Sequence, residues 1–133
     1  MKSFEIQISA GFYIGLALAV LMLPWRILLA FGIGASFHEL CHLAALGCCG
    51  IPVRLIRIGL MGAVITTAPM LPGQELICAV AGPLGSLLLV GFSGWMPELT
   101  LFGLVQGVFN LLPIYPLDGG RVVRAIFMLA KMT

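Results

Sequence analysis

The chain has 133 residues, of which 61% are hydrophobic and only 9% are charged, and its mean hydropathy is +1.15. A water-soluble domain of this length cannot bury so much apolar surface, because small domains leave much of their surface exposed. The composition therefore predicts an integral membrane protein in contact with a lipid bilayer. A net charge of only +2, without a basic run, argues against nucleic acid as a partner.

The N-terminal region changes character after residue 9. Residues 1–9 (MKSFEIQIS) alternate apolar and polar side chains, which predicts a short strand at the membrane surface. Residues 11–23 are wholly apolar and end at Pro24, which predicts a first, rather short membrane span. The single lysine before this run is reminiscent of a signal peptide. Because no small-residue cleavage site precedes Pro24-Trp25-Arg26, we interpret the run as a membrane anchor.

Residues 27–49 form the second predicted span and contain His38, Glu39 and His42 in the HExxH spacing. Histidines four apart on a helix lie about 40° from each other around its axis, so both imidazoles leave the same face. They offer two nitrogen ligands for zinc, beside a carboxylate that can accept a proton from water. A structural histidine pair is the alternative. Polar groups within an apolar span are costly, however, and this favours a metal site.

The middle of the chain predicts a different local structure. Residues 51–72 are β-branched, interrupted by glycines and closed by prolines, which predicts two short strands around a turn. Such a hairpin can enter the membrane only where its backbone groups find partners inside the protein. Residues 74–95 predict a third span, with Gly82-Pro83 near its middle. The proline predicts a kink or local unwinding. Whether this serves packing or borders the site stays open.

Residues 99–117 predict a fourth span that is disturbed from Asn110 onward by Pro113 and Pro116. Unwinding there would bring Asp118 back toward the membrane interior, before a short helix over residues 121–132. The fold class is therefore an all-α polytopic membrane protein. It has about four transmembrane helices, a short membrane-associated β-hairpin after the second, and one domain over residues 1–133.

A catalytic zinc site needs a third protein ligand. The candidates are Asp118, Glu75, Glu98 and the four cysteines. Glu75 and Glu98 stand at the ends of the third span, where an exposed carboxylate is ordinary. The cysteines form no C-x-x-C pair and are expected to act as small apolar residues. Asp118 follows a broken helix and precedes two glycines, and we favour it as the third ligand.

Two motifs in this order resemble those of the site-2 protease family of intramembrane zinc metalloproteases. HELCH (38–42) matches the family's HExxH, and NLLPIYPLDGG (110–120) matches its NxxPxxPxDG. Ala81-Gly82-Pro83 resembles the family's AGP element. This chain has Ser86 shortly afterwards, where the family often carries asparagine, and it contains no inserted PDZ-like domain.

The resemblance implies one zinc ion per chain, held by His38, His42 and Asp118, with Glu39 as general base. It also implies that Asn110 helps to hold the substrate or the developing oxyanion. The expected function is zinc-dependent endopeptidase cleavage of a transmembrane segment in a membrane-protein substrate. The alternative is a catalytically silent membrane protein that binds metal or transmembrane helices. Strands within residues 53–67 could capture the unwound substrate by strand addition.

The distribution of cations predicts the orientation. If the chain crosses the membrane four times, six of its seven lysines and arginines lie on one side of the membrane and only Arg26 lies on the other. The six are Lys2, Arg54, Arg57, Arg121, Arg124 and Lys131. The positive-inside rule then makes both termini cytoplasmic, in a multi-pass protein of the cell (plasma) membrane. A regulatory membrane partner or an oligomer stays open.

Overall fold

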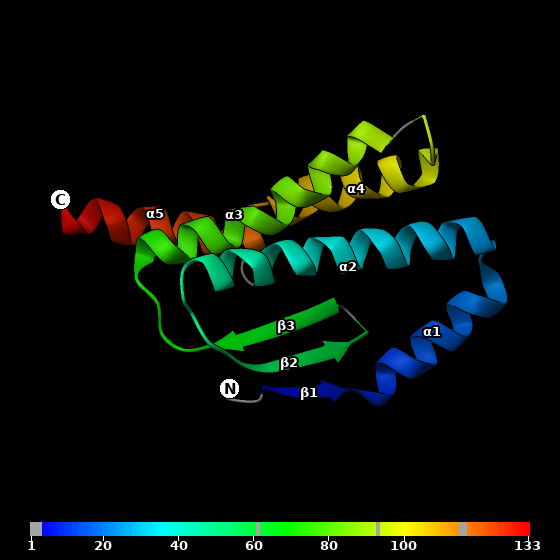
Figure 1. Ribbon diagram of the computed structural model, residues 1–133, viewed down its shortest axis with the longest axis horizontal. Helices are drawn as coiled ribbons and strands as arrows, with labels where there is room; N and C mark the ends of the chain where they lie inside the picture. Colours follow the sequence, from blue (N-terminus) through cyan, green and yellow to red (C-terminus); the bar gives the residue numbers. More distant parts are fainter. Residues whose placement is uncertain (1–3, 61, 93, 115–116) are drawn as a thin grey trace.

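The computed structural model describes residues 4–60, 62–92, 94–114 and 117–133 (Figure 1). Its elements follow the order β1 (Glu5–Ile8), α1 (Ala10–Met22), α2 (Trp25–Cys48), β2 (Val53–Gly59), β3 (Gly62–Thr67), α3 (Pro72–Leu88), η1 (Leu89–Phe92), α4 (Pro97–Asn110) and α5 (Asp118–Met132). Four helices, α2 to α5, form a bundle, and a small sheet lies below α2 in the view of Figure 1. The prediction of a mostly helical chain with two strands after the second helix is confirmed.

The sheet is larger than the predicted hairpin. β2 and β3 pair antiparallel, and β1 pairs parallel to β2 from Glu5↔Leu55 to Ile8↔Ile58, so the strand order is β1-β2-β3. The N-terminal strand is thus confirmed over Glu5–Ile8, while residues 1–3 of its predicted range lie outside the described residues. Its pairing with the hairpin was not predicted; α1 and α2 carry the chain back to β2, as a parallel pairing requires.

Within the bundle, α3 contacts α2, α4 and α5. Two glycines one turn apart allow the close approach of α4. A Cβ atom at Gly103 would lie 2.5 Å from the Ser86 carbonyl oxygen, and one at Gly107 would lie 2.9 Å from Leu87. Small residues at this spacing are typical of helix contacts in membranes. By contrast, a Cβ atom at Gly32 of α2 would have no neighbour within 4 Å among the described residues.

Proline affects α3 and α4 differently. α3 stays α-helical through Pro83, so the predicted alternative of local unwinding is wrong. Pro83 is buried, and packing of α3 against both α2 and α4 holds the helix together despite one missing N–H. α4 ends at Asn110, as predicted, and α5 begins at Asp118 rather than at residue 121. Pro116 lies outside the described residues.

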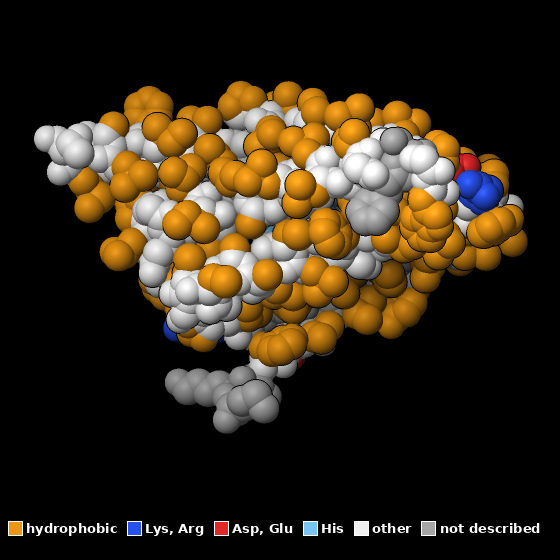
Figure 2. Space-filling view, turned by 45° about the horizontal axis from the view of Figure 1, so that its top comes forward, with side chains coloured by type: hydrophobic (Ala, Val, Ile, Leu, Met, Phe, Trp, Pro, Cys, Tyr) orange, Lys and Arg blue, Asp and Glu red, His pale blue; other side chains and the backbone are white. Residues whose placement is uncertain are grey.

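The surface is dominated by apolar side chains (Figure 2), including Leu21 at 82% and Met22 at 79% exposure. Among the described residues, two helices are long and apolar enough to cross a bilayer, namely Trp25–Cys48 and Pro72–Gly91. α1 has 13 residues and is only about 20 Å long. Exposed apolar surface on this scale suits hydrocarbon rather than water, and it agrees with the predicted membrane protein.

Candidate metal centre

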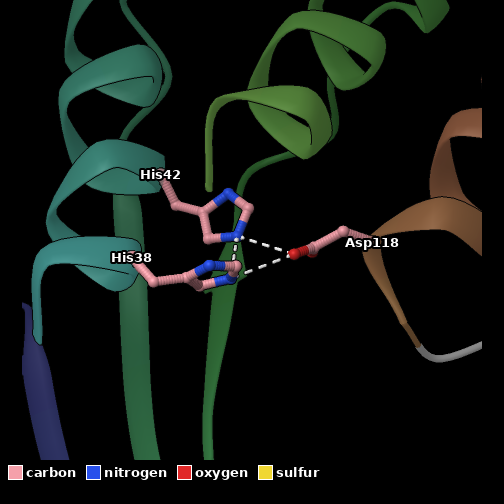
Figure 3. A group of neighbouring side chains, drawn as sticks. All are labelled: His38, His42 and Asp118. Carbon is pink, nitrogen blue, oxygen red and sulfur yellow. Dashed lines mark hydrogen bonds and ion pairs between the residues drawn. The ribbon is translucent and has the colours of Figure 1, made fainter. Parts of the chain in front are cut away.

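His38 and His42 lie one turn apart on α2, and both are buried, with 2% and 6% exposure. As predicted from their spacing, both rings leave the same face of the helix, toward α3 and α5 (Figure 3). Their Nε2 atoms are 3.2 Å apart. The two imidazoles therefore both direct their Nε2 atoms toward one point.

Asp118 reaches that point from the first residue of α5. Its Oδ2 lies 3.1 Å from Nε2 of each histidine (Figure 3). The following residue explains how α5 comes so close: a Cβ at Gly119 would lie 2.2 Å from the Leu111 carbonyl oxygen and 2.3 Å from that of Leu112. The chain that leaves α4 thus passes directly against the start of α5, and only glycine fits between them.

The other ring nitrogens are fixed by buried acceptors. His42 Nδ1 lies 2.7 Å from the carbonyl oxygen of Cys78, which can only accept, so Nδ1 carries the proton. His38 Nδ1 lies 2.7 Å from Ser86 Oγ, whose hydroxyl in turn lies 3.5 Å from Gln106 Oε1. With the Ser86 hydroxyl donating to Gln106, Nδ1 of His38 is also the donor. Both Nε2 atoms then expose lone pairs.

Three electron-pair donors, two Nε2 atoms and a carboxylate oxygen, therefore converge at separations of 3.1–3.2 Å. A tetrahedral zinc ion with ligand distances of about 2.0–2.1 Å would hold neighbouring ligand atoms about 3.3 Å apart. Hydrogen bonds from the outer ring nitrogens to oxygen acceptors are the usual arrangement around metal-bound histidines. His38, His42 and Asp118 thus fit a metal ion. Among the described residues, they are the one group of three or more His, Cys, Asp or Glu side chains placed closely enough to hold one.

Gly82 forms a wall of this centre. A Cβ at Gly82 would lie 2.2 Å from His42 Nε2 and 2.8 Å from His38 Nε2. The Ala81-Gly82-Pro83 stretch therefore borders the site, which resolves the alternative that the sequence left open. Any side chain here would occupy the space of the two Nε2 atoms.

Glu39 and Asn110 lie apart from the three converging atoms. Both line a cavity of about 950 Å³ that also reaches His38, His42 and Asp118. Both side chains are half-buried. Asn110 Nδ2 donates to the Gln106 carbonyl oxygen at 2.9 Å, so one of its donor groups is used within α4. Glu39 has no hydrogen bond among the described residues and remains available to a molecule in the cavity.

The other candidates for a third ligand do not join the centre. Glu75 is buried beside Arg124, at 3.3 Å, and Arg121, at 3.8 Å. Glu98 pairs with Arg26 at 2.8 Å. The four cysteines are free thiols outside the group. Ser86 was noted in the sequence only as a departure from a family pattern. A hydroxyl in an otherwise apolar predicted helix was the signal in the sequence that could have found its contact with His38.

Comparison with known proteins agrees with this geometry. No protein-family model matches the chain. It is 29% identical over 128 residues to "Zinc metalloprotease MJ0392" of Methanocaldococcus jannaschii, an alignment that covers 85% of this chain and 38% of that protein. It is 34% identical over 108 residues to "Putative zinc metalloprotease Rip3" of Mycobacterium tuberculosis, covering 66% of this chain and 27% of that protein.

A solved structure, "Site-2 Protease from Methanocaldococcus jannaschii", matches with a TM-score of 0.74 and 27% identity, covering 92% of this chain and 66% of that chain. The chain therefore spans about two fifths or less of the length of the curated relatives it matches.

Proposed function

Because the chain belongs to the site-2 protease family of zinc metalloproteases, we propose that it hydrolyses a peptide bond within a transmembrane segment of a protein substrate. The observation that carries the proposal is the convergence of two histidine nitrogens and one aspartate oxygen at 3.1–3.2 Å, in a cavity that Glu39 also lines. This combines three ligands, an open side and an acid–base group, as zinc-dependent hydrolysis requires.

In this proposal His38, His42 and Asp118 hold one zinc ion per chain. When bound, zinc acts as a Lewis acid, which makes water more acidic and a carbonyl more electrophilic. The Cys78 carbonyl and the Ser86 hydroxyl keep both histidines in the tautomer that leaves Nε2 free, and they hold the rings in place.

Glu39 is the proposed general base. Its carboxylate accepts a proton from the water that attacks the scissile carbonyl, and then delivers that proton to the departing amine nitrogen. Asn110 lines the same cavity, and we propose that its amide hydrogen-bonds the substrate near the reacting carbonyl. Its bond to Gln106 fixes the side chain without using all of its hydrogen-bonding groups.

The position of the centre along α2 supports cleavage within the membrane. α2 has 24 residues, so it is about 36 Å long, and His42 lies about 9 Å from its end at Cys48. We propose four spans formed by α1, α2, α3 with η1, and α4, although α1 and α4 are short for a hydrocarbon core of about 30 Å. We also propose that the Cys48 end of α2 and both termini face the cytoplasm in the plasma membrane.

Arg54, Arg57, Arg121, Arg124 and Lys131 support this orientation through the positive-inside rule. Lys2, which belongs to the same argument, lies outside the described residues. A cysteine placed at position 26 should react with a membrane-impermeant thiol reagent from outside the cell only. Labelling of that cysteine from the cytosol would overturn the orientation.

The sheet offers a way to hold an unwound substrate. β3 lies at the edge of the sheet order, and its residues from Gly62 to Ile65 line the cavity of the metal centre. We propose that the substrate segment adds to this edge as an extended strand, with its backbone next to the catalytic groups. Extension is needed because a peptide bond inside a helix is sterically shielded and internally hydrogen-bonded.

The test is cleavage of a single-span reporter by purified protein in detergent or vesicles. Cleavage should stop on addition of a chelator and return with zinc. Asp118→Ala should lose both zinc and cleavage, because it removes a ligand. Glu39→Gln should keep zinc and lose cleavage by about 10²–10⁴-fold, the usual contribution of a general base. Wild-type cleavage by a zinc-loaded Glu39→Gln protein would refute the assignment, and full zinc in Asp118→Ala would remove Asp118 from the ligand set.

A further inference from the structure

The cavity of the metal centre is also lined by four arginines: Arg54, Arg57, Arg121 and Arg124. The first two come from β2 and the last two from α5. Successive strand residues normally point to opposite faces of a sheet, so positions 54 and 57 should face apart. The pairing register shifts between Val53 and Leu55, which leaves Arg54 as an extra residue in a bulge. Such a bulge can re-aim a side chain, and both residues line the same cavity.

The carboxylates that line this cavity are already engaged. Asp118 belongs to the metal centre, and Glu39 lies beside it as the proposed base. Glu75 is 8% exposed and pairs with Arg121 and Arg124. No carboxylate of the cavity lining is left for Arg54 or Arg57.

Arg54 and Arg57 have no hydrogen bond or ion pair within the described parts of the chain. The neighbour of Arg57 on β1 is Gln7, whose amide donates to Glu5 at 2.8 Å. Both arginines are exposed, so water or another molecule can reach them. They therefore present two uncompensated positive charges in the cavity that contains the proposed catalytic groups.

We propose that Arg54 and Arg57 select substrates that carry Asp or Glu next to the scissile segment, on the side toward the Cys48 end of α2. This inference rests on the proposed function. β2 starts near that end and runs back in the opposite direction to α2 (Figure 1), so Arg54 comes before Arg57 in the direction away from that end, and both residues line the cavity. A substrate strand on β3 would lie two strands away from Arg57, whose pairing partner on β3 is Val64. Two strand spacings are about 10 Å, a gap that a long arginine and an acidic side chain can bridge.

A topological role alone does not account for this arrangement. The positive-inside rule requires cations near one membrane face, but it does not require that they line the cavity; Lys131 contributes to it from the exposed end of α5, outside the cavity lining. Anionic lipid headgroups are the other source of negative charge, but they lie at the membrane surface. The shared cavity with Glu39 favours a carboxylate that enters with the substrate polypeptide.

The experiment measures binding, so that it does not depend on catalysis. Glu39→Gln protein in vesicles of neutral phosphatidylcholine is titrated with synthetic single-span peptides. The peptides differ only in the flank, which carries two aspartates, two asparagines or two lysines. We expect the aspartate peptide to bind about tenfold more tightly than the asparagine peptide, since each exposed ion pair contributes a few-fold. High salt should reduce this ratio.

Substitutions in the arginines should then change the preference. Arg54→Gln with Arg57→Gln should bring the ratio to about one, and Arg54→Glu with Arg57→Glu should make the lysine peptide the preferred one. Lys131→Gln is the matched control, since it removes one positive charge outside the cavity, and it should leave the ratio unchanged. Zinc content is measured in every variant to show that the metal centre is intact.

Equal binding of the aspartate and asparagine peptides by the Glu39→Gln protein would overturn the proposal. So would a preference that survives both arginine substitutions, or a gain in affinity that needs added anionic lipid and is equal for all three peptides. These outcomes are separate from a failure of the proposed function, in which protein with Glu39 intact would cleave none of the three peptides although it binds them.

Discussion

The helical bundle of α2 to α5 differs from α1 and the three-stranded sheet in how deeply its residues are buried. Fully buried residues occur throughout the bundle, where Ser86, Ala79 and Ala125 are 0% exposed. α1 has no buried residue, and the described residues of the three strands are all at least partly exposed. The candidate ligand atoms lie in the bundle, while residues of β3 and the arginines of β2 line the cavity from the sheet.

This difference indicates a division of labour. A metal centre needs ligands held to within a fraction of an ångström, which close packing provides. Capturing a flexible segment needs reachable backbone groups and charges, which a loosely covered sheet provides. If the division is real, changes in the bundle should alter metal binding, and changes in the sheet should alter substrate handling at constant metal content.

The largest effect is expected from Gly82→Ala. The added methyl would overlap His42 Nε2, 2.2 Å away, so the imidazoles must turn out of their shared direction. We expect zinc to fall to a small fraction of the wild-type content and cleavage to fall at least about 100-fold, as for other displacements of about 1 Å in active sites. Metal analysis and a reporter assay measure the two effects.

Gly73→Ala is the control for this substitution. It adds the same methyl to the same helix, at a position with no described neighbour within 4 Å. Its zinc content and activity should match those of the wild type. A Gly82→Ala protein with full zinc would show that the bundle can absorb the strain, and the contrast between bundle and sheet would lose its main support.

Ser86→Ala should have a smaller effect, confined to metal affinity. It removes the acceptor for His38 Nδ1 and leaves a buried N–H without a partner. Losing such an outer hydrogen bond typically costs about 10–100-fold in metal affinity. Competition with a chelator measures this directly. Thr100→Val, which removes a hydroxyl that donates to the Leu89 carbonyl oxygen elsewhere in the bundle, should bind zinc as the wild type does.

Sequence reasoning found the parts of the centre that depend on local spacing. The shared face of His38 and His42 follows from helix periodicity, and the break after Asn110 follows from proline chemistry. Ser86 is 48 residues from its partner His38. The position of Gly82 against both rings likewise arises from the packing of α3 on α2, which no local pattern encodes. The α-helical course of α3 through Pro83 has the same origin, because its neighbours stabilise a helix that an isolated proline would disturb.

The sheet was predicted in part. Alternating residues and closing prolines predicted β2, β3 and an N-terminal strand, but the parallel pairing of β1 joins Glu5 to Leu55 across α1 and α2. The bulge at Arg54 also depends on pairing rather than on the local sequence. Both features concern partners that are distant along the chain.

Proline at Val64 or Ile65 tests the sheet side of the comparison. Along an antiparallel strand, successive N–H groups point alternately toward the partner strand and away from it. One of these two residues therefore donates to β2, and the other faces the free edge. Either proline should reduce cleavage about tenfold, since each removes one backbone donor, and zinc content should not change.

Val64→Thr and Ile65→Thr serve as controls, because they keep both the backbone donor and a β-branched side chain. The proline that faces the free edge should also leave thermal stability unchanged. Cleavage at the wild-type rate in both proline variants would remove strand addition from the proposed mechanism, and a loss of zinc would mean that the sheet supports the metal centre after all.

The smallest effect is expected at the end of the bundle far from the cavity. Arg26 and Glu98 form a paired contact, with Nε to Oε1 at 2.8 Å and Nη2 to Oε2 at 3.2 Å, and both side chains are partly exposed. Exposed ion pairs of this kind contribute little. Glu98→Gln should therefore keep full zinc and cleave within about twofold of the wild type.

Glu75→Gln makes the same chemical change inside the cavity, where it releases Arg121 and Arg124 from their partner, and it should alter cleavage more strongly. If Glu98→Gln were instead the more damaging of the two, the remote end would take part in substrate handling, and the assignment of that role to the sheet and its arginines would be too narrow.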